Sequence, residues 1–125
     1  MSTVIVEHQS KNSIKMTWAS RVNDNDVKQS FKEIDKILSA AAHPMFVVVD
    51  ITSNPNFPIT ATLTGALFGP HRNPKLREWL IIGSNTAAHF IERTLSGATG
   101  RIIVRWFETE AQVSAYIQQV RDNVA

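Results

Sequence analysis

The chain begins with two segments in which apolar and polar residues alternate. Val4 and Val6 share one face of the first segment, and Ile14, Met16 and Trp18 share one face of the second. Strict alternation is typical of strands that bury one face. The intervening residues QSKNS favour a turn, so the pattern predicts an N-terminal hairpin.

Three later segments are apolar without alternation, at residues 45–51, 77–83 and 100–107. Continuous apolar runs of this length are typical of strands that are buried on both faces of a parallel sheet. The pattern therefore predicts three buried strands.

The first predicted helix covers residues 22–42 and has one apolar stripe. The members of this stripe recur at intervals of three and four, as on one face of a helix. They are Val27, Phe31, Ile34 and Leu38. Asn23 or Asp24 can cap the start of this helix, and His43-Pro44 ends it.

Three further helices are expected. A short one covers residues 60–69 and ends at Gly69-Pro70. The next covers 85–97, with Asn85 as cap and Gly97 as terminator. Its inward residues are expected to be Ala87, Phe90, Ile91 and Leu95.

The last predicted helix covers 109–124, and Thr109 and Gln112 stand at the spacing of a capping box. Its expected stripe is Val113, Ile117, Val120 and Val124. The predicted order is ββαβαβαβα, without linker or repeat. Strands that alternate with helices favour an α/β fold, a mostly parallel sheet with the N-terminal hairpin at one edge. We expect one domain, 1–125.

Composition excludes several classes of function. Thirteen basic and eleven acidic residues give a formal charge of +2, too small to argue for nucleic-acid binding. There is no cysteine, which excludes disulfides and thiolate metal sites. No apolar run approaches the ~20 residues of a membrane span. The first residues do not resemble a signal peptide, so a cytoplasmic location is expected.

Open α/β sheets place ligand sites at the carboxyl ends of their strands, which here lead into residues 50–60, 83–86 and 107–109. Asp50 is the only acid of the first of these loops. A general acid or base needs a partner within hydrogen-bond reach, and the loop sequence supplies none. We therefore expect Asp50 to anchor the loop by accepting hydrogen bonds from its backbone N–H groups.

The sequence contains no pattern that indicates a metal site, a nucleotide site or a hydrolase site. The four histidines lie far apart, without the close spacing of metal ligands, and no metal site is expected. Ser84 and Asn85 precede a helix and could cradle an anion, but capping alone explains them. The motifs of nucleotide sites and of serine hydrolases are absent. The sequence thus predicts neither catalytic residues nor a cofactor.

Several segments together resemble the STAS-like domain, the fold of the anti-sigma-factor antagonists. They are the opening hairpin, the strand FVVVDI that ends in Asp50, the loop that leads to a helix beginning with Thr, and the closing FETEAQVSAYI. The resemblance spans nearly the whole chain. A related branch of the fold is that of the lipid-binding CRAL-TRIO domains.

The resemblance implies a regulatory switch. In the antagonists, a Ser or Thr at the start of the helix after the strand that ends in Asp is phosphorylated by a partner kinase. The matching residue is Thr60, with Thr62 as second candidate, although Ile59 stands where the family usually has an acid. The alternative is that Thr60 is only a helix N-cap.

The sequence therefore predicts a non-enzymatic regulatory or adaptor module that docks on another protein. A kinase and an anti-sigma factor are the candidate partners, and a homodimer stays open. Besides the two threonines, the expected docking or ligand face comprises Ser53, Asn54, Asn56, Phe57, Ser84 and Asn85. The alternative is a small-molecule or lipid-binding domain with a pocket under the second helix, where Leu63, Leu67 and Phe68 lie.

Overall fold

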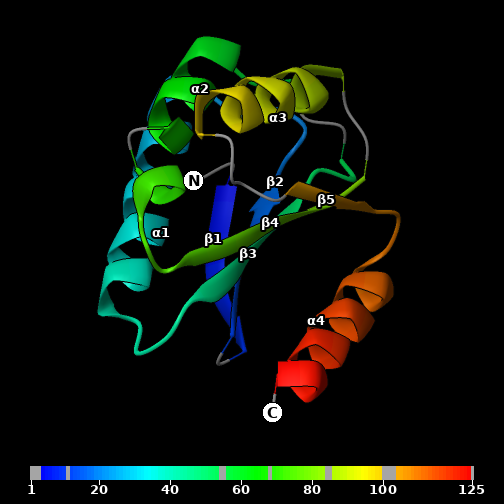
Figure 1. The fold of residues 1–125 in the computed structure, drawn as a ribbon. Coiled ribbons are helices and arrows are strands. Elements are labelled where there is room, and N and C mark those ends of the chain that lie inside the picture. Colours follow the sequence, from blue (N-terminus) through cyan, green and yellow to red (C-terminus); the bar gives the residue numbers. More distant parts are fainter. Residues whose placement is uncertain are drawn as a thin grey trace.

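Five strands form one sheet, and their order in the sheet follows their order in the chain (Figure 1). The computed structural model describes residues 4–10, 12–53, 56–67, 69–83, 86–99 and 104–124. The strands are β1 (Val4–Ser10), β2 (Ser13–Trp18), β3 (Met45–Asp50), β4 (Leu76–Ile82) and β5 (Val104–Phe107). β1 pairs antiparallel with β2, and every other neighbouring pair is parallel. The predicted class, a mostly parallel α/β sheet with an N-terminal hairpin, is confirmed.

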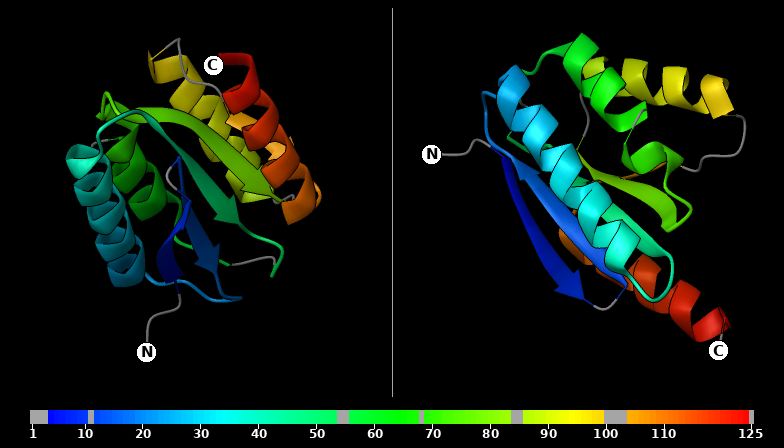
Figure 2. Two further views of the ribbon diagram at one scale, coloured as in Figure 1. Left: turned by 90° about the horizontal axis from the view of Figure 1, so that it is seen from below. Right: turned by 90° about the vertical axis from the view of Figure 1, so that its left-hand side faces the viewer.

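The helices divide between the two faces of the sheet. They are α1 (Asp24–Ala40), α2 (Ile59–Leu67), α3 (Thr86–Thr99) and α4 (Glu110–Val124), and a short 3₁₀ turn, η1 (Pro70–Arg72), follows α2. Each of α1, α2 and α3 connects a strand to the next parallel strand in the sheet. Right-handed crossovers that all advance in one direction place their helices on one face. Figures 1 and 2 show α4 on the other side of the sheet from α2 and α3.

Each face of the sheet carries its own core. Residues of β2, β3 and β4 that point to the first face pack against α1, α2 and α3, and they include Ile14, Met16, Val47 and Trp79. The smaller core on the second face joins Phe46, Val48, Leu80 and Ile82 to Val113 of α4. β3 is buried on both faces, as its unbroken apolar run predicted.

Two helix starts match their predicted caps. Asn23 accepts a hydrogen bond from the backbone N–H of Asp26 at 2.8 Å. At α4 the capping box is complete: Thr109 Oγ1 accepts from the N–H of Gln112 at 3.2 Å, and Gln112 Oε1 accepts from the N–H of Thr109 at 3.4 Å. The same Gln112 oxygen also accepts from the N–H of Glu108 at 2.8 Å.

Three expectations about the second half of the chain are wrong. β5 is not buried on both faces, because it lies at the sheet edge, where Arg105 is exposed. Gly97 does not end α3, because the helix continues to Thr99. Gly97 also lacks the positive φ that is typical of helix-ending glycines, since among the described glycines only Gly83 has a positive φ. Phe90 is 48% exposed rather than inward, since Ile91, the next residue, occupies the buried face of α3.

Candidate functional site

The carboxyl ends of β3, β4 and β5 are joined to one another at one edge of the sheet. The N–H of Ile51 donates to the carbonyl of Ile82 at 2.9 Å, and the N–H of Gly83 donates to the carbonyl of Phe107 at 2.8 Å. Gly83 has φ of +106°, and a Cβ there would lie 3.3 Å from the carbonyl carbon of Ile51. Glycine is the residue that adopts this positive φ and allows this close approach to Ile51 without strain.

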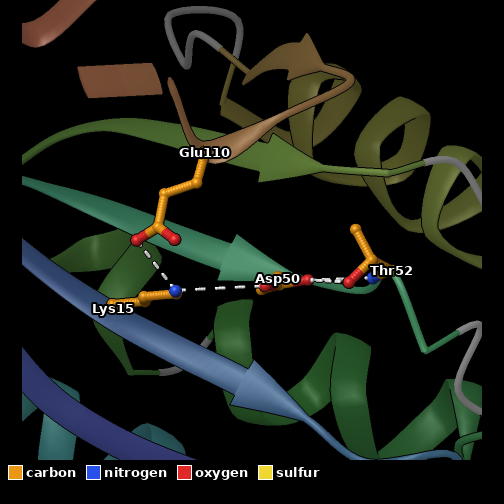
Figure 3. Close-up of polar contacts among 4 residues, drawn as sticks. All are labelled: Lys15, Asp50, Thr52 and Glu110. Atoms are coloured by element: carbon orange, nitrogen blue, oxygen red, sulfur yellow. Dashed lines mark hydrogen bonds and ion pairs between the residues drawn. The ribbon is translucent and has the colours of Figure 1, made fainter. Parts of the chain in front are cut away.

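Asp50 ends β3 at this edge and binds the loop that follows it (Figure 3). Its Oδ1 accepts from the N–H of Thr52 at 2.9 Å and from the Thr52 hydroxyl at 2.6 Å. The hydrogen bond expected from the loop backbone is therefore present. The second carboxylate oxygen lies 4.0 Å from Nζ of Lys15, which also contacts Oε1 of Glu110 at 2.9 Å.

The ion pairs of Lys15 link three elements that are distant in sequence. In the register of β2 and β3, Thr17 lies beside Asp50, and Lys15 lies two residues further back on the same face. Glu110 starts α4 and reaches over this face of the sheet. The lysine therefore holds the start of α4 against the ends of β2 and β3. The alternation in the second strand puts Lys15 on the other face of the strand from Ile14 and Met16. Its ion-pair partners, Asp50 and Glu110, follow only from the assembled sheet and helix α4.

Loop residues 56–58 are fixed to the segment after β2. The N–H of Val22 donates to the carbonyl of Asn56 at 3.1 Å, and the N–H of Asn56 donates to the carbonyl of Ser20 at 2.9 Å. Phe57 is only 9% exposed and packs edge to face on Trp18, with ring centroids 5.0 Å apart. Phe57 was expected on a docking or ligand face. Its ring is part of the core and does not form an exposed docking surface, although it lines the apolar cavity described below.

The two candidate phosphoacceptors differ in exposure. Thr60 is exposed in the first turn of α2, but the helix begins at Ile59, so Thr60 is not the N-cap residue. Thr62 is 4% exposed, and its hydroxyl faces the interior. Ser53 and Asn56 are exposed at the same edge of the sheet. The remaining candidates, Asn54, Ser84 and Asn85, lie outside the described residues.

An apolar cavity of about 70 Å³ lies between the first face of the sheet and helices α1, α2 and α3. From α2 it is lined by Thr62 and Ala66. Leu63, expected in such a pocket, packs against the core instead, and Phe68 and the side chain of Leu67 lie outside what is described. The lining residues from β2 are buried, whereas Ala88 and Glu92 of α3 are half-buried. The cavity therefore approaches the surface beside α3.

Two residues that line this cavity each have a buried polar atom without a hydrogen-bond partner among the described residues. The atoms are Nε1 of Trp18 and Oγ1 of Thr62, and the two residues are 3% and 4% exposed. Nε1 of Trp79 donates to Nδ1 of His71 at 3.3 Å, and Nε1 of Trp106 donates to Oε1 of Glu92 at 3.4 Å. Most buried polar side-chain atoms are paired, so two such exceptions beside one cavity need an explanation.

A second polar cluster lies on the α4 side of the sheet. Glu78 of β4 is 6% exposed, and both its oxygens accept from the Tyr116 hydroxyl at 2.6 Å. Nε of Arg105 donates to the same carboxylate at 3.0 Å. Burial and then the hydrogen bond to Glu78 raise the pKa of Tyr116, and the hydrogen bond to Glu78 raises the pKa of Arg105 against the opposing effect of burial. The residue pattern does not predict this cluster, which joins α4 to β4 and β5.

The described residues contain no group of three His, Asp or Glu side chains that could hold a metal ion. His89 instead stacks on Trp106, with ring centroids 3.7 Å apart. Among the helices in the described part of the chain, none is long and apolar enough to cross a membrane.

No family model matches the sequence, and no curated protein is similar to it. Among solved structures the chain is similar to an uncharacterised protein of the DUF3478 family from Shewanella loihica PV-4, which has a SpoIIAA-like fold. The likeness covers 90% of each chain, with a TM-score of 0.63 and 15% sequence identity. The chain thus has the SpoIIAA-like fold, that of the STAS domains and anti-sigma-factor antagonists.

Proposed function

We propose that this protein is a non-enzymatic regulatory module that docks on another protein through the N-terminal ends of α2 and α3. The observation that carries this proposal is the position of two exposed apolar side chains. Ile59 is 40% exposed at the start of α2, and Phe90 is 48% exposed in the second turn of α3. No other large hydrophobic residue of the described chain is exposed to this degree.

Both helices begin at the carboxyl edge of the sheet and pack against each other. Ile59 and the exposed Thr60 lie in the first turn of α2, and Phe90 lies in the second turn of the neighbouring helix α3. We name these three residues the α2–α3 face. Large exposed apolar side chains that gather on neighbouring elements mark interaction sites more often than isolated ones do. The SpoIIAA-like fold supports the docking role by analogy only.

In this proposal Thr60 is the phosphoacceptor. Its hydroxyl is exposed in the first turn of α2, where the free N–H groups and the helix dipole favour a phosphate. The same phosphate would place about two negative charges beside Ile59 and repel an apolar or acidic partner. Thr62 does not suit this role, since a kinase reaches a buried hydroxyl only after local unfolding.

Asp50 is proposed as the anchor of the loop before this face, through its two hydrogen bonds with Thr52. The proposed partner is a cytoplasmic kinase or anti-sigma factor. A second copy of the chain is the alternative, which native mass spectrometry distinguishes by the mass of the assembly.

Affinity capture with matched variants tests the docking surface. Phe90→Asp should abolish capture of the partner, because it places a charge in the apolar contact. Ser114→Asp is the control, since Ser114 is exposed on α4, across the sheet. A partner that is captured equally by wild type and Phe90→Asp, or lost equally from both variants, contradicts the proposed surface.

A second candidate function is the binding of a small ligand in the cavity beside α2. The apolar cavity favours it. Native mass spectrometry of the purified protein tests it, because a retained ligand adds its mass to that of the chain.

A further inference from the structure

The exposed side of α3 carries an aromatic ring and a cation one turn apart. Phe90 is 48% exposed, and Arg93 is exposed three residues further along the helix. Side chains three residues apart are neighbours on one face of a helix. Ile91, in contrast, is buried in the core on the first face of the sheet. Phe90 and Arg93 therefore form one exposed stripe, which we name the Phe90–Arg93 stripe.

The positive charge of Arg93 has no acidic neighbour on this stripe. Glu92 is the only acid of α3, and its carboxylate accepts a hydrogen bond from Nε1 of Trp106 at 3.4 Å. Consecutive residues of a helix do not face each other. The neighbouring helix α2 contains no charged residue. In the described part of the chain no carboxylate pairs with Arg93, so its guanidinium is available to an acid of another molecule.

A second copy of the chain does not supply the missing acid. In a two-fold contact both copies offer the same surface, so a contact centred on the Phe90–Arg93 stripe brings the stripe against itself. Two Arg93 side chains then share one interface, and neither stripe offers them a carboxylate. Like charges placed together in an interface reduce the affinity. The stripe therefore fits a different, acidic protein better than a second copy.

We propose that the partner docks through an acidic amphipathic helix, which lies along α3 with an apolar side chain on Phe90 and a carboxylate on Arg93. An apolar residue and an acid one turn apart on the partner helix match the spacing of the stripe. Amphipathic helices commonly lay their apolar face on exposed apolar groups of another protein. The inference rests on the proposed docking function and adds the chemistry of the partner. An acidic helix is also a partner that a phosphate on Thr60 would repel.

Three synthetic helical peptides test the charge of the partner. They share one stripe of leucines and differ only in the residues beside it, which are Glu in the first peptide, Gln in the second and Lys in the third. Fluorescence anisotropy of the labelled peptides measures the affinity of each for the purified protein. The Glu peptide should bind about 2- to 5-fold more tightly than the Gln peptide, the range of an exposed ion pair, and the Lys peptide should bind most weakly. Added salt should reduce these differences.

Charge reversal at Arg93 tests whether this residue reads the charge. Arg93→Glu should invert the order of affinities, so that the Lys peptide binds most tightly and the Glu peptide most weakly. Lys28→Glu is the matched control, because Lys28 is exposed on α1 and the substitution changes the net charge by the same amount. It should leave the order as in wild type. Phe90→Ser should weaken all three peptides by about 10-fold or more, since it removes the apolar contact without adding a charge.

The outcomes separate this inference from the docking proposal on which it rests. The same order of affinities in wild type and Arg93→Glu would overturn the acidic partner, even if Phe90→Ser still weakens all three peptides. Equal binding of the peptides to wild type and Phe90→Ser would also overturn it, because the peptides would then bind elsewhere. If no peptide binds wild type, the acidic helix is wrong as the partner. In each case the capture assay with Phe90→Asp decides the docking surface independently.

Discussion

Replacement of Thr62 by valine should stabilise the folded protein. The Thr62 hydroxyl is buried in α2 without a partner among the described residues, beside a cavity whose wall is apolar. An unsatisfied buried polar group costs about 1–3 kcal/mol. Valine and threonine have the same shape and similar helix propensities, so the substitution removes the polar cost and changes little else.

The expected gain is about 1–2 kcal/mol, the lower part of that range. Globular proteins unfold with an entropy of about 2.1 cal/mol/K per residue, or about 0.26 kcal/mol/K for 125 residues. The gain therefore corresponds to a rise of about 4–8 °C in Tm.

Urea unfolding followed by circular dichroism measures the change, and an unchanged m-value shows that the unfolding transition is the same. Thr64→Val is the matched control, since Thr64 is exposed on the same helix and should change stability by less than about 0.5 kcal/mol. Thr62→Ser is the second control, because it keeps the hydroxyl and loses a buried methyl group, and it should destabilise. A loss of 1 kcal/mol or more in Thr62→Val would refute the reasoning, since it would mean that the hydroxyl has a partner in the folded protein.

Three further predictions concern Asp50, Tyr116 and Thr60. Asp50→Asn should lower the free energy of unfolding by about 1–3 kcal/mol, because the hydrogen bonds to Thr52 weaken and the ion pair with Lys15 is lost. An unchanged urea midpoint would contradict the role of Asp50 as anchor of the loop. Tyr116 is the only tyrosine of the chain, and its pKa is raised in the folded protein. Its contribution to stability is therefore complete below about pH 10, the pKa of tyrosine in the unfolded chain. That contribution is lost as the pH rises through the higher pKa of the folded protein. Its near-ultraviolet tyrosinate absorbance should therefore titrate at a higher pH in the native protein than in urea, and coincident curves would contradict this. Thr60→Glu should abolish partner binding in the capture assay while Thr60→Ala preserves it, and if both variants bind like wild type, Thr60 is not the switch.

Local patterns predicted the elements well, because they depend on residues close in the chain. The alternation in β2, the unbroken run of β3 and the capping box of Thr109 and Gln112 each follow from spacing alone. The same patterns misplaced Phe90 and Phe57, since their burial depends on which neighbouring element covers them.

Contacts between distant elements were beyond sequence reasoning. Lys15 meets Glu110 across 95 positions, and Tyr116 meets Glu78 across 38. Such pairs follow from the order and register of the strands, which the residue pattern does not specify. The sequence predicted a pocket under the second helix at Leu63, Leu67 and Phe68, whereas the cavity is lined from α2 by Thr62 and Ala66. Which residues of a helix line a cavity depends on how the helix packs in the assembled fold.

Hydrogen exchange of the protein with and without its captured partner tests the docking proposal most directly. The account predicts that the partner slows amide exchange in the first turns of α2 and α3, around Ile59, Thr60 and Phe90, and leaves α4 unchanged. Protection confined to α4 or to the β1 edge of the sheet, with α2 and α3 exchanging as in the free protein, would contradict it.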